Sequence, residues 1–267
     1  MKHSFLAASA AAFVLAGSQV LAADLPTRAP VYKAQPAYFS WTGFYIGANA
    51  GWGRNDDDGA PFCINPGGVL NGNGCRTTNV PGAQIRSDGG FVGGQIGYNV
   101  QNGMFVWGVE ADFQGSDIKD SISIPGPFAT VGGGAAGGTR FDASHSMDWF
   151  GTVRARLGLA AYDRALIYAT GGLIYGRVQV SQNTVFPNTQ YASTLETTRT
   201  GWTAGGGIEF AFAPNWSGKV EALYYDMGSV STQALGSPVN DGFIGGKTFD
   251  LKGGLVRAGI NYRFGWY

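Results

Sequence analysis

Residues 105–114, FVWGVEADFQ, alternate between two kinds of side chain. A period of two is the mark of a β-strand with two different faces, because successive side chains in a strand point to opposite sides. One face carries Phe105, Trp107, Val109, Ala111 and Phe113. The other face carries Val106, Gly108, Glu110, Asp112 and Gln114. The pattern predicts a strand whose aromatic face and charged face lie in different surroundings.

The same alternation recurs along the chain and predicts eight strands. Each is long enough to cross a bilayer at a tilt, which takes roughly 9–11 residues. Trp, Tyr and Phe near the strand ends suit the aromatic girdles of barrels at the two membrane surfaces. The predicted strands are 41–53, 88–101, 104–115, 146–162, 165–178, 199–213, 215–228 and 248–264.

The connections between these strands alternate in length. Tight turns are expected at 101–103, 162–164 and 213–215, and Asn102-Gly103 supplies the positive φ that a short hairpin needs. Long polar loops are expected at 54–87, 116–145, 179–198 and 229–247. Short turns at one end and long extracellular loops at the other are typical of outer-membrane barrels. We therefore expect an all-β, eight-stranded antiparallel up-and-down transmembrane β-barrel.

Charged residues of the predicted strands share the face opposite to the aromatic residues. A Lys or Arg at the lipid midplane would cost about 2–4 kcal/mol, so this face is expected to point inward, where opposite charges can pair. In the alternative, a soluble β-sandwich, it would point to water. An eight-stranded barrel is just wide enough for side chains to fill, which argues against a wide pore. The expected interior charge network comprises Glu110, Asp112, Arg154, Arg156, Glu209, Lys219, Glu221, Arg257 and Arg263.

The N-terminal part of the sequence has the pattern of an export signal. A basic start precedes an apolar run over residues 5–16, which is too short to span a bilayer of roughly 30 Å as a helix. Small residues follow, and we expect cleavage after Ala22 or Ala23. The expected organisation is a signal peptide at 1–23, a proline-containing periplasmic linker at 24–40 and the barrel domain at 41–267.

The composition argues against nucleic acid as a partner, and the two cysteines predict a disulfide. The chain has 18 basic and 18 acidic side chains, so no net charge attracts nucleic acid. Its 44 glycines suit closely packed strands better than long helices, in which glycine costs about 1 kcal/mol relative to alanine. Cys63 and Cys75 lie in a polar stretch of an exported chain, so we expect a disulfide between them.

No catalytic, cofactor-binding or metal-binding residue is predicted. His145 stands near Ser144 and Asp148, so a lipid A-modifying hydrolase is conceivable, but a triad is defined by spatial geometry and a solvated loop histidine is the simpler interpretation. The glycine run at 132–137 matches a dinucleotide-binding pattern literally, without the helix that should follow it. The acidic run at 56–58 lacks the spacing of a calcium-binding loop.

Three short motifs resemble one family of bacterial surface proteins. The most specific is WTGFYIGANAG at 41–51, and GQIGYN at 94–99 and GINYRF at 259–264 look similar as well. They resemble the Omp25/Omp31-like immunogenic surface proteins of alphaproteobacteria, small barrels of the opacity and porin type. The resemblance covers about residues 41–264.

This resemblance implies a protein of the Gram-negative cell outer membrane that supports envelope integrity or surface interaction through exposed loops. It implies no catalytic residue and no cofactor, and a narrow porin or small-solute channel is the alternative function. The implied partners are outer-membrane lipids and lipopolysaccharide, the barrel assembly machinery, and host or environmental ligands of the loops. Such barrels usually end in an aromatic residue that the assembly machinery reads, and the candidates here are Phe264, Trp266 and Tyr267.

Overall fold

The computed structural model describes residues 39–59, 62–66, 85–129, 135–161, 164–237 and 243–264. Within these ranges no helix is long and apolar enough to cross a membrane. The strands, in chain order, are β1 (Gly43–Asp56), β2 (Cys63–Pro66), β3 (Arg86–Asn102), β4 (Phe105–Pro125), β5 (Phe128–Ala129), β6 (Ala135–Ala136), β7 (Arg140–Ala161), β8 (Ala165–Val185), β9 (Gln190–Ala213), β10 (Trp216–Leu235) and β11 (Phe243–Phe264).

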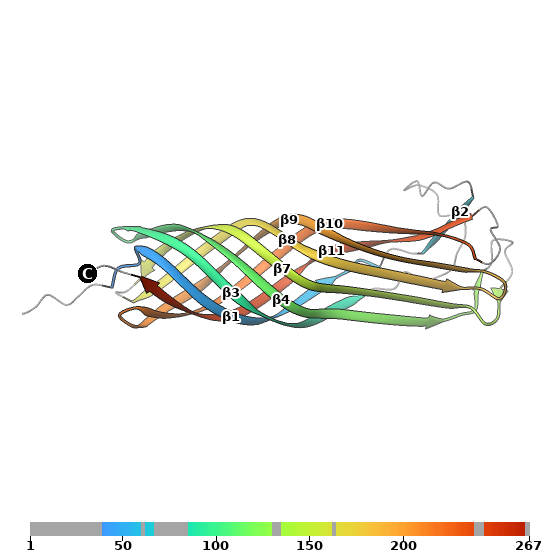
Figure 1. Ribbon diagram of the computed structural model, residues 1–267, viewed down its shortest axis with the longest axis horizontal. Coiled ribbons are helices and arrows are strands. Elements are labelled where there is room, and N and C mark those ends of the chain that lie inside the picture. The colour runs from blue at the N-terminus through green and yellow to red at the C-terminus, as the bar shows by residue number, and fades with distance from the viewer. Residues whose placement is uncertain are drawn as a thin grey trace, which may run out of the picture. The chain divides into compact units, whose positions relative to one another are not determined.

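The long strands close into a ring (Figure 1). They pair antiparallel in the order β1, β3, β4, β7, β8, β9, β10 and β11, and β11 returns to β1. The seam between β1 and β11 holds twelve register pairs, from Phe44 opposite Phe264 to Asn55 opposite Gly253. The predicted eight-stranded up-and-down barrel is therefore confirmed, and closure gives every long strand a hydrogen-bonded neighbour on both sides.

Tight turns join strands at the end of the barrel that carries Phe264. Only Gly103 and Met104 separate β3 from β4, and Gly103 has a φ of 61°, a left-handed conformation that glycine adopts without steric cost. The tight turn predicted here is present. At the other end, β2 pairs with the first residues of β11, and β5 pairs with β6.

The strands run well beyond their predicted ends, which corrects the expected loops at 116–145, 179–198 and 229–247. β4 continues to Pro125, β7 begins at Arg140, and β8 and β9 remain paired as far as Val185 and Gln190. We name the end of the barrel that contains these continuations the extension. It comprises residues 53–58, 85–89, 116–129, 140–148, 176–201, 226–237 and 243–253.

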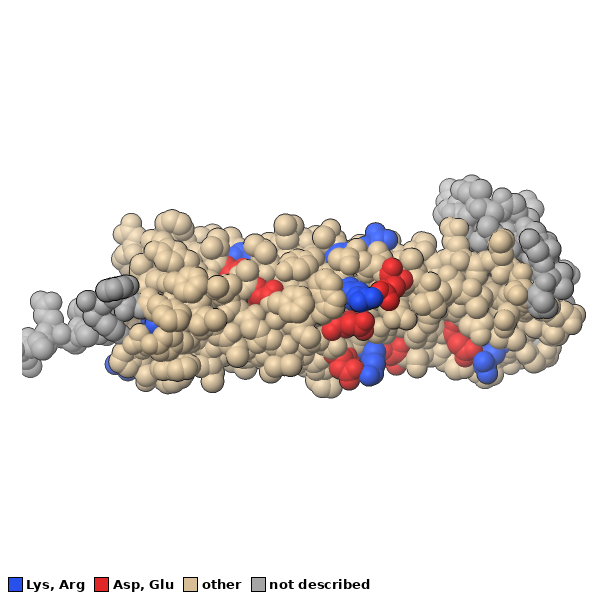
Figure 2. All heavy atoms as spheres, viewed as in Figure 1, with Lys and Arg blue, Asp and Glu red and all other residues tan. Residues whose placement is uncertain are grey.

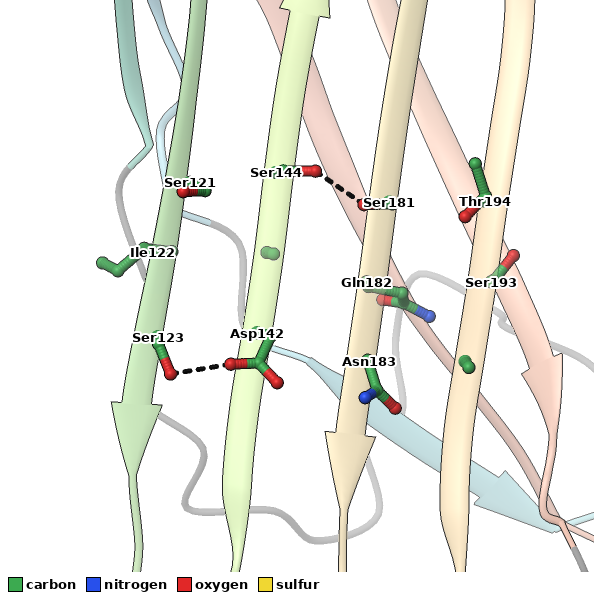
Figure 3. Close-up of a pocket in the computed structure, with 12 residues that line it drawn as sticks. Ser121, Ile122, Ser123, Asp142, Ser144, Ser181, Gln182, Asn183, Ser193 and Thr194 are labelled. Atoms are coloured by element: carbon green, nitrogen blue, oxygen red, sulfur yellow. Dashed lines mark hydrogen bonds between the residues drawn. The ribbon is translucent and has the colours of Figure 1, made fainter.

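The outward side chains of the extension are mostly polar, and many of them are short. Ser121, Ser144, Ser181 and Thr194 are register partners in one row across β4, β7, β8 and β9 (Figure 3). Because these segments have no apolar set of residues that could face lipid, the sequence predicted loops here.

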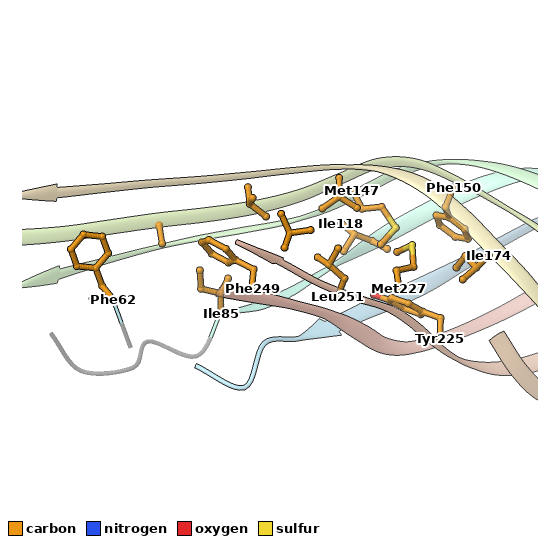
Figure 4. Close-up of a cluster of buried hydrophobic side chains, with 14 of the residues drawn as sticks. Phe62, Ile85, Ile118, Met147, Phe150, Ile174, Tyr225, Met227, Phe249 and Leu251 are labelled. Carbon is orange, nitrogen blue, oxygen red and sulfur yellow. The ribbon is translucent and has the colours of Figure 1, made fainter. Parts of the chain in front are cut away.

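Most of the inward side chains of the extension are apolar (Figure 4). They form one buried cluster in which Phe249, Val178 and Ile118 are at most 1% exposed. Apolar residues inside and polar residues outside are the arrangement of a water-exposed barrel, because burial removes apolar surface from water. The extension therefore has the opposite polarity to a lipid-facing barrel.

Register shifts lie where the polarity changes. In β7 the buried side chains of Phe150, Thr152, Arg154 and Arg156 are even-numbered, whereas those of Phe141, Ala143, His145 and Met147 are odd-numbered. Asp148 is the extra residue, since the pairing with β8 shifts between Met147 and Trp149. Similar shifts occur in β4, between Gly115 and Ile118, and in β10, between Asp226 and Ser229. Such β-bulges insert a residue on one strand and re-aim the side chains beyond it.

The remaining outer wall, between the turns and the bulges, is apolar, and we name it the apolar belt. Figure 2 shows few charged side chains over the barrel's C-terminal end and gathered charges farther along. Aromatic rings in contact mark both borders: Trp216, Tyr262, Phe264 and Phe44 near the turns, and Phe113, Trp149 and Tyr175 near the bulges. Among its exposed residues are Ile46, Trp107, Val109, Val153, Leu157, Leu173, Ile208, Val220, Val256 and Ile260.

Candidate functional site

A network of buried ion pairs fills the barrel inside the apolar belt. The side chains of its members are at most 4% exposed, so each charged group is bound by other protein groups in place of water. Eight of the residues predicted for the interior meet here. They are the carboxylates Glu110, Asp112, Glu209 and Glu221 and the cations Arg154, Arg156, Lys219 and Arg257.

Glu110 on β4 is the centre of this network. Its Oε1 accepts hydrogen bonds from Arg154 Nη2 at 2.6 Å and Lys219 Nζ at 2.8 Å. Its Oε2 accepts from Lys219 Nζ at 2.7 Å and from the Tyr45 hydroxyl at 2.8 Å. Tyr45 on β1 can reach Glu110 on β4 because its register partner on the intervening strand β3 is Gly97. A Cβ atom at position 97 would collide with the Tyr45 hydroxyl. A glycine thus shapes the site by leaving room for a larger side chain.

Two arginines share the remaining carboxylates near Glu110. Arg154 Nη1 donates to Glu221 at 2.8 Å, and Arg257 Nε donates to the other oxygen of Glu221 at 2.6 Å. Both arginines also reach Asp112 Oδ2, at 3.2 and 3.0 Å, and the Thr152 hydroxyl donates to the same atom at 2.6 Å. These charges come from β4, β7, β10 and β11, so the contacts tie separate parts of the wall together.

A second group lies around Glu209 on β9. Arg156 Nη2 donates to Glu209 at 2.7 Å, while Ser217 and Asn261 donate to its other oxygen at 2.6 and 2.8 Å. With four carboxylates and four cations, the network carries no net formal charge. Balance matters here because removing one partner of a buried pair leaves an uncompensated charge, at a cost of about 3–5 kcal/mol.

Apolar clusters adjoin the network on both sides. Toward the turns, Trp41, Leu166 and Tyr168 belong to one cluster, and Arg263 stacks against Trp41 and Phe39, at 3.8 Å from the Phe39 ring centre. Arg263 therefore lies against aromatic rings at this end. Toward the extension, the network meets the larger apolar cluster of Figure 4. Along the interior, the described residues thus place a charged layer between two apolar clusters.

His145 is buried in the extension, which corrects its interpretation as a solvated loop histidine. It lies on β7 and is 2% exposed. Its Nδ1 shares a hydrogen bond of 2.9 Å with the Ser87 hydroxyl, and its Nε2 has no partner among the described residues. Burial lowers the pKa of His145 to about 4, against a smaller opposing effect of the Asp57 carboxylate.

Lys247 and Asp57 form a buried ion pair in the extension that was not predicted from the sequence. Lys247 Nζ lies 2.7 Å from Asp57 Oδ2, and the two side chains are at most 3% exposed. Both residues fell in expected loops. The alternation of the sequence could have predicted that Lys247 is buried. It lies two and four residues before Phe249 and Leu251, which are buried on the same face of β11.

The serines beside His145 in the sequence do not assemble a catalytic triad with it. Ser144 and Ser146 alternate with His145 along β7 and point outward. The Ser144 hydroxyl shares a hydrogen bond with the Ser181 hydroxyl at 2.6 Å, and Asp142 accepts one from Ser123 at 2.7 Å. The part of the chain that the structure describes also holds no cluster of three or more metal-ligating side chains.

Some predicted features fall outside the described residues. These are the signal peptide at 1–23, most of the linker at 24–40, and Cys75, Trp266 and Tyr267. The disulfide between Cys63 and Cys75 and the assembly role of the terminal aromatic residues therefore stay predictions. Phe264 is described, and its ring contacts those of Tyr262 and Phe44, with centroids 5.0 and 5.9 Å away.

Comparison with known proteins identifies the family. Residues 8–264 match the family of the outer membrane protein beta-barrel domain. The chain belongs to the outer-membrane β-barrel family. Among its relatives is the 31 kDa outer-membrane immunogenic protein of Brucella melitensis, which is 38% identical over 276 residues, covering 99% of this chain and 100% of the relative. The 22 kDa outer membrane protein of Rhizobium leguminosarum is 31% identical, covering 70% of this chain and 64% of the relative.

Solved outer-membrane barrels are among the structures that align with this chain. The structure of OprG from Pseudomonas aeruginosa covers 84% of this chain and 97% of its own, with a TM-score of 0.49 and 13% identity. The relatives confirm the expected location, so this outer-membrane β-barrel lies in the cell outer membrane. Its apolar belt is then the lipid-facing surface. The tight turn between β3 and β4 lies at one end of this belt and the extension at the other.

Proposed function

We propose that this protein is a structural and surface-interaction protein of the outer membrane. Its barrel anchors the extension, which presents its outer wall and its end to the surroundings, and its presence supports envelope integrity. The observation that carries the proposal is the filled interior, in which the ion-pair network lies between two apolar clusters. A solute passing through would have to separate buried charge pairs, whereas an anchor needs only a stable interior.

The surroundings of the barrel suggest its partners. Outer-membrane lipids and lipopolysaccharide would contact the apolar belt, and the barrel assembly machinery would read the aromatic residues Phe264, Trp266 and Tyr267. Relatives of this chain are named immunogenic proteins of the outer membrane. Since immunogenic surface proteins are accessible from outside, we extend this accessibility to the present chain and expect host or environmental ligands at the end of the extension.

Two measurements test the proposal. In planar bilayers, the refolded protein should show no stable openings beside a porin that conducts under the same conditions. Stable single-channel steps would favour the alternative, a narrow channel. In cells, deletion of the gene should raise sensitivity to detergent, and the wild-type gene should restore resistance. Unchanged detergent sensitivity after deletion would contradict the role in envelope integrity.

A further inference from the structure

The outer wall of the extension carries a polar groove of about 520 Å³ that the proposed function does not use. Its lining comes from β4, β7, β8 and β9, with Ser121, Ser144, Ser181 and Asn183 among the outward side chains (Figure 3). These outward residues alternate with inward, buried ones such as Ala143, so the groove lies on the outside of the barrel. Its size is within the range of about 300–1,000 Å³ typical of small-molecule sites.

The groove arises because two adjacent rows of short side chains cross four strands. One row is Ser121, Ser144, Ser181 and Thr194. The next row is Ser123, Asp142, Asn183 and Ala192. Serine and alanine leave a hollow where longer residues would cover the backbone. The wall is therefore concave and is lined mainly by hydroxyl and amide groups.

The polar groups of the groove retain capacity for a ligand. A serine hydroxyl has one donor and two acceptor positions, and Ser144 and Ser181 use one hydrogen bond between them. The Oδ1 atom of Asn183 has no hydrogen-bond partner among the described residues. Asp142 supplies a carboxylate that accepts from Ser123 and from Arg140, at 2.7 and 2.8 Å. Hydroxyls, an amide and one carboxylate are the groups that hydrogen-bond the many hydroxyls of a sugar.

The groove is also placed for a ligand that is anchored in the membrane. On β8, Tyr175 belongs to the aromatic border of the lipid-facing belt, and Ser181 follows it on the same strand. Six residues of strand span roughly 20 Å, which is within reach of the headgroup of a glycolipid.

We propose that this groove binds the sugar headgroup of a glycolipid in the outer leaflet. The hydroxyl rows, the Asn183 amide and the Asp142 carboxylate hydrogen-bond the sugar. Anchoring of the acyl chains against the apolar belt raises the local concentration of the headgroup, so individually weak contacts suffice. The inference depends on the location of the barrel in the outer membrane and is independent of the role proposed in envelope integrity.

The test compares two serines in equivalent settings. Ser181 lies in the groove, whereas Ser231 faces outward from β10 outside it, and each shares a hydrogen bond with a hydroxyl on the adjacent strand. Ser181→Tyr fills the groove, and Ser231→Tyr is the matched control. Asn183→Ala removes hydrogen-bonding atoms without adding bulk. Heat-modifiability on a gel checks that all three variants fold.

The measurement is the affinity of the folded full-length chain for rough-type lipopolysaccharide, determined by native mass spectrometry. Ser181→Tyr should weaken binding about tenfold, as expected for the loss of one or two hydrogen bonds and the filled space, and Asn183→Ala a few-fold. Ser231→Tyr should stay within about twofold of the wild type. The deacylated, water-soluble oligosaccharide should compete for the site, while phosphatidylglycerol should not.

Two results would overturn the proposal. One is equal affinity of wild type, Ser181→Tyr and Asn183→Ala, which would mean that lipopolysaccharide binds elsewhere. The other is competition by phosphatidylglycerol as strong as by lipopolysaccharide, which would mean that charge and acyl chains alone are recognised. Loss of glycolipid binding without any change in detergent sensitivity would support the groove and leave the envelope proposal to its own test.

Discussion

The carboxylate of Glu110 on β4 binds Lys219 Nζ on β10 across the barrel, at 2.7 and 2.8 Å, although these strands share no edge. The pair therefore connects two walls that no backbone hydrogen bond joins. In the same place Glu110 also meets Arg154 and Arg257. A residue on one strand thus influences the packing of three others.

Replacing Glu110 should destabilise the barrel more than replacing it together with its partner. Glu110→Gln leaves Lys219 and its neighbouring cations without their shared carboxylate, and the free energy of unfolding should fall by about 3–5 kcal/mol. Glu110→Gln combined with Lys219→Met removes one buried cation and should recover roughly half of that loss. Urea unfolding of the refolded protein, followed by tryptophan fluorescence, measures both. Equal stability of the single and double variants would contradict the coupling.

The lipid-facing assignment predicts where a new charge blocks assembly. Val109 is 59% exposed in the apolar belt, so Val109→Arg places a cation in the lipid at a cost of about 2–4 kcal/mol. Ser121 also faces outward from β4, but in the extension, so Ser121→Arg should assemble normally. The amount of heat-modifiable protein in isolated outer membranes measures assembly. Similar amounts of the two variants would show that the belt does not face lipid.

The membrane-facing half of the barrel could be predicted because its alternation is unbroken. In β4, Val109 and Phe113 point out and Glu110 and Asp112 point in, as periodicity alone indicates. The cost of a charge in lipid then decides which face is inside. The partners of each charge could not be predicted, because they depend on the register of strands far apart in sequence, as in the contact of Glu110 with Lys219.

The extension could not be predicted because its polarity is reversed and its phase is shifted. Around His145 the sequence alternates Ser144, His145, Ser146 and Met147, which has the composition of a loop. The extra residue at Asp148 also breaks the phase that links this segment to Arg154. A lipid-facing pattern was expected throughout, so a segment with polar residues on the outside was taken to be unpaired.

The apolar interior of the extension predicts that shortening one of its buried side chains destabilises the extension locally. Phe249 is 1% exposed, and Phe249→Ala should destabilise the extension by about 3–5 kcal/mol, because it removes a large side chain from the cluster. Thr248→Ala, which loses the hydrogen bond with Ser231, should cost no more than about 1 kcal/mol. Limited proteolysis in vesicles should cut the extension of Phe249→Ala faster while its lipid-embedded part stays intact. Equal cleavage rates for the two variants would contradict a packed interior.

Burial of His145 predicts a loss of stability in acid. Its folded-state pKa of about 4 lies below the ordinary value of 6.5, so the unfolded chain binds a proton that the folded chain excludes. Its contribution is therefore complete above about pH 6.5 and declines by about 1.4 kcal/mol per pH unit as the pH falls toward 4. His145→Gln, which has no titrating ring, should lack this part of the pH dependence.

The measurement is the difference between wild type and His145→Gln in the urea midpoint of the extension at several pH values from 7.5 to about 4. Carboxylates that titrate in this range are common to both proteins and cancel in the difference. A constant difference over the whole range would show that His145 is solvated in the folded state.

The β1–β11 seam has a consequence for biosynthesis. Its twelve register pairs join the first long strand to the last, so the cylinder cannot be sealed until the final segment has been translated and delivered. A chain that stops before β11 leaves β1 and β10 each without one neighbour, and such open edges invite pairing with other polypeptides. Truncated products should therefore be cleared by periplasmic proteases rather than persist as partly working fragments.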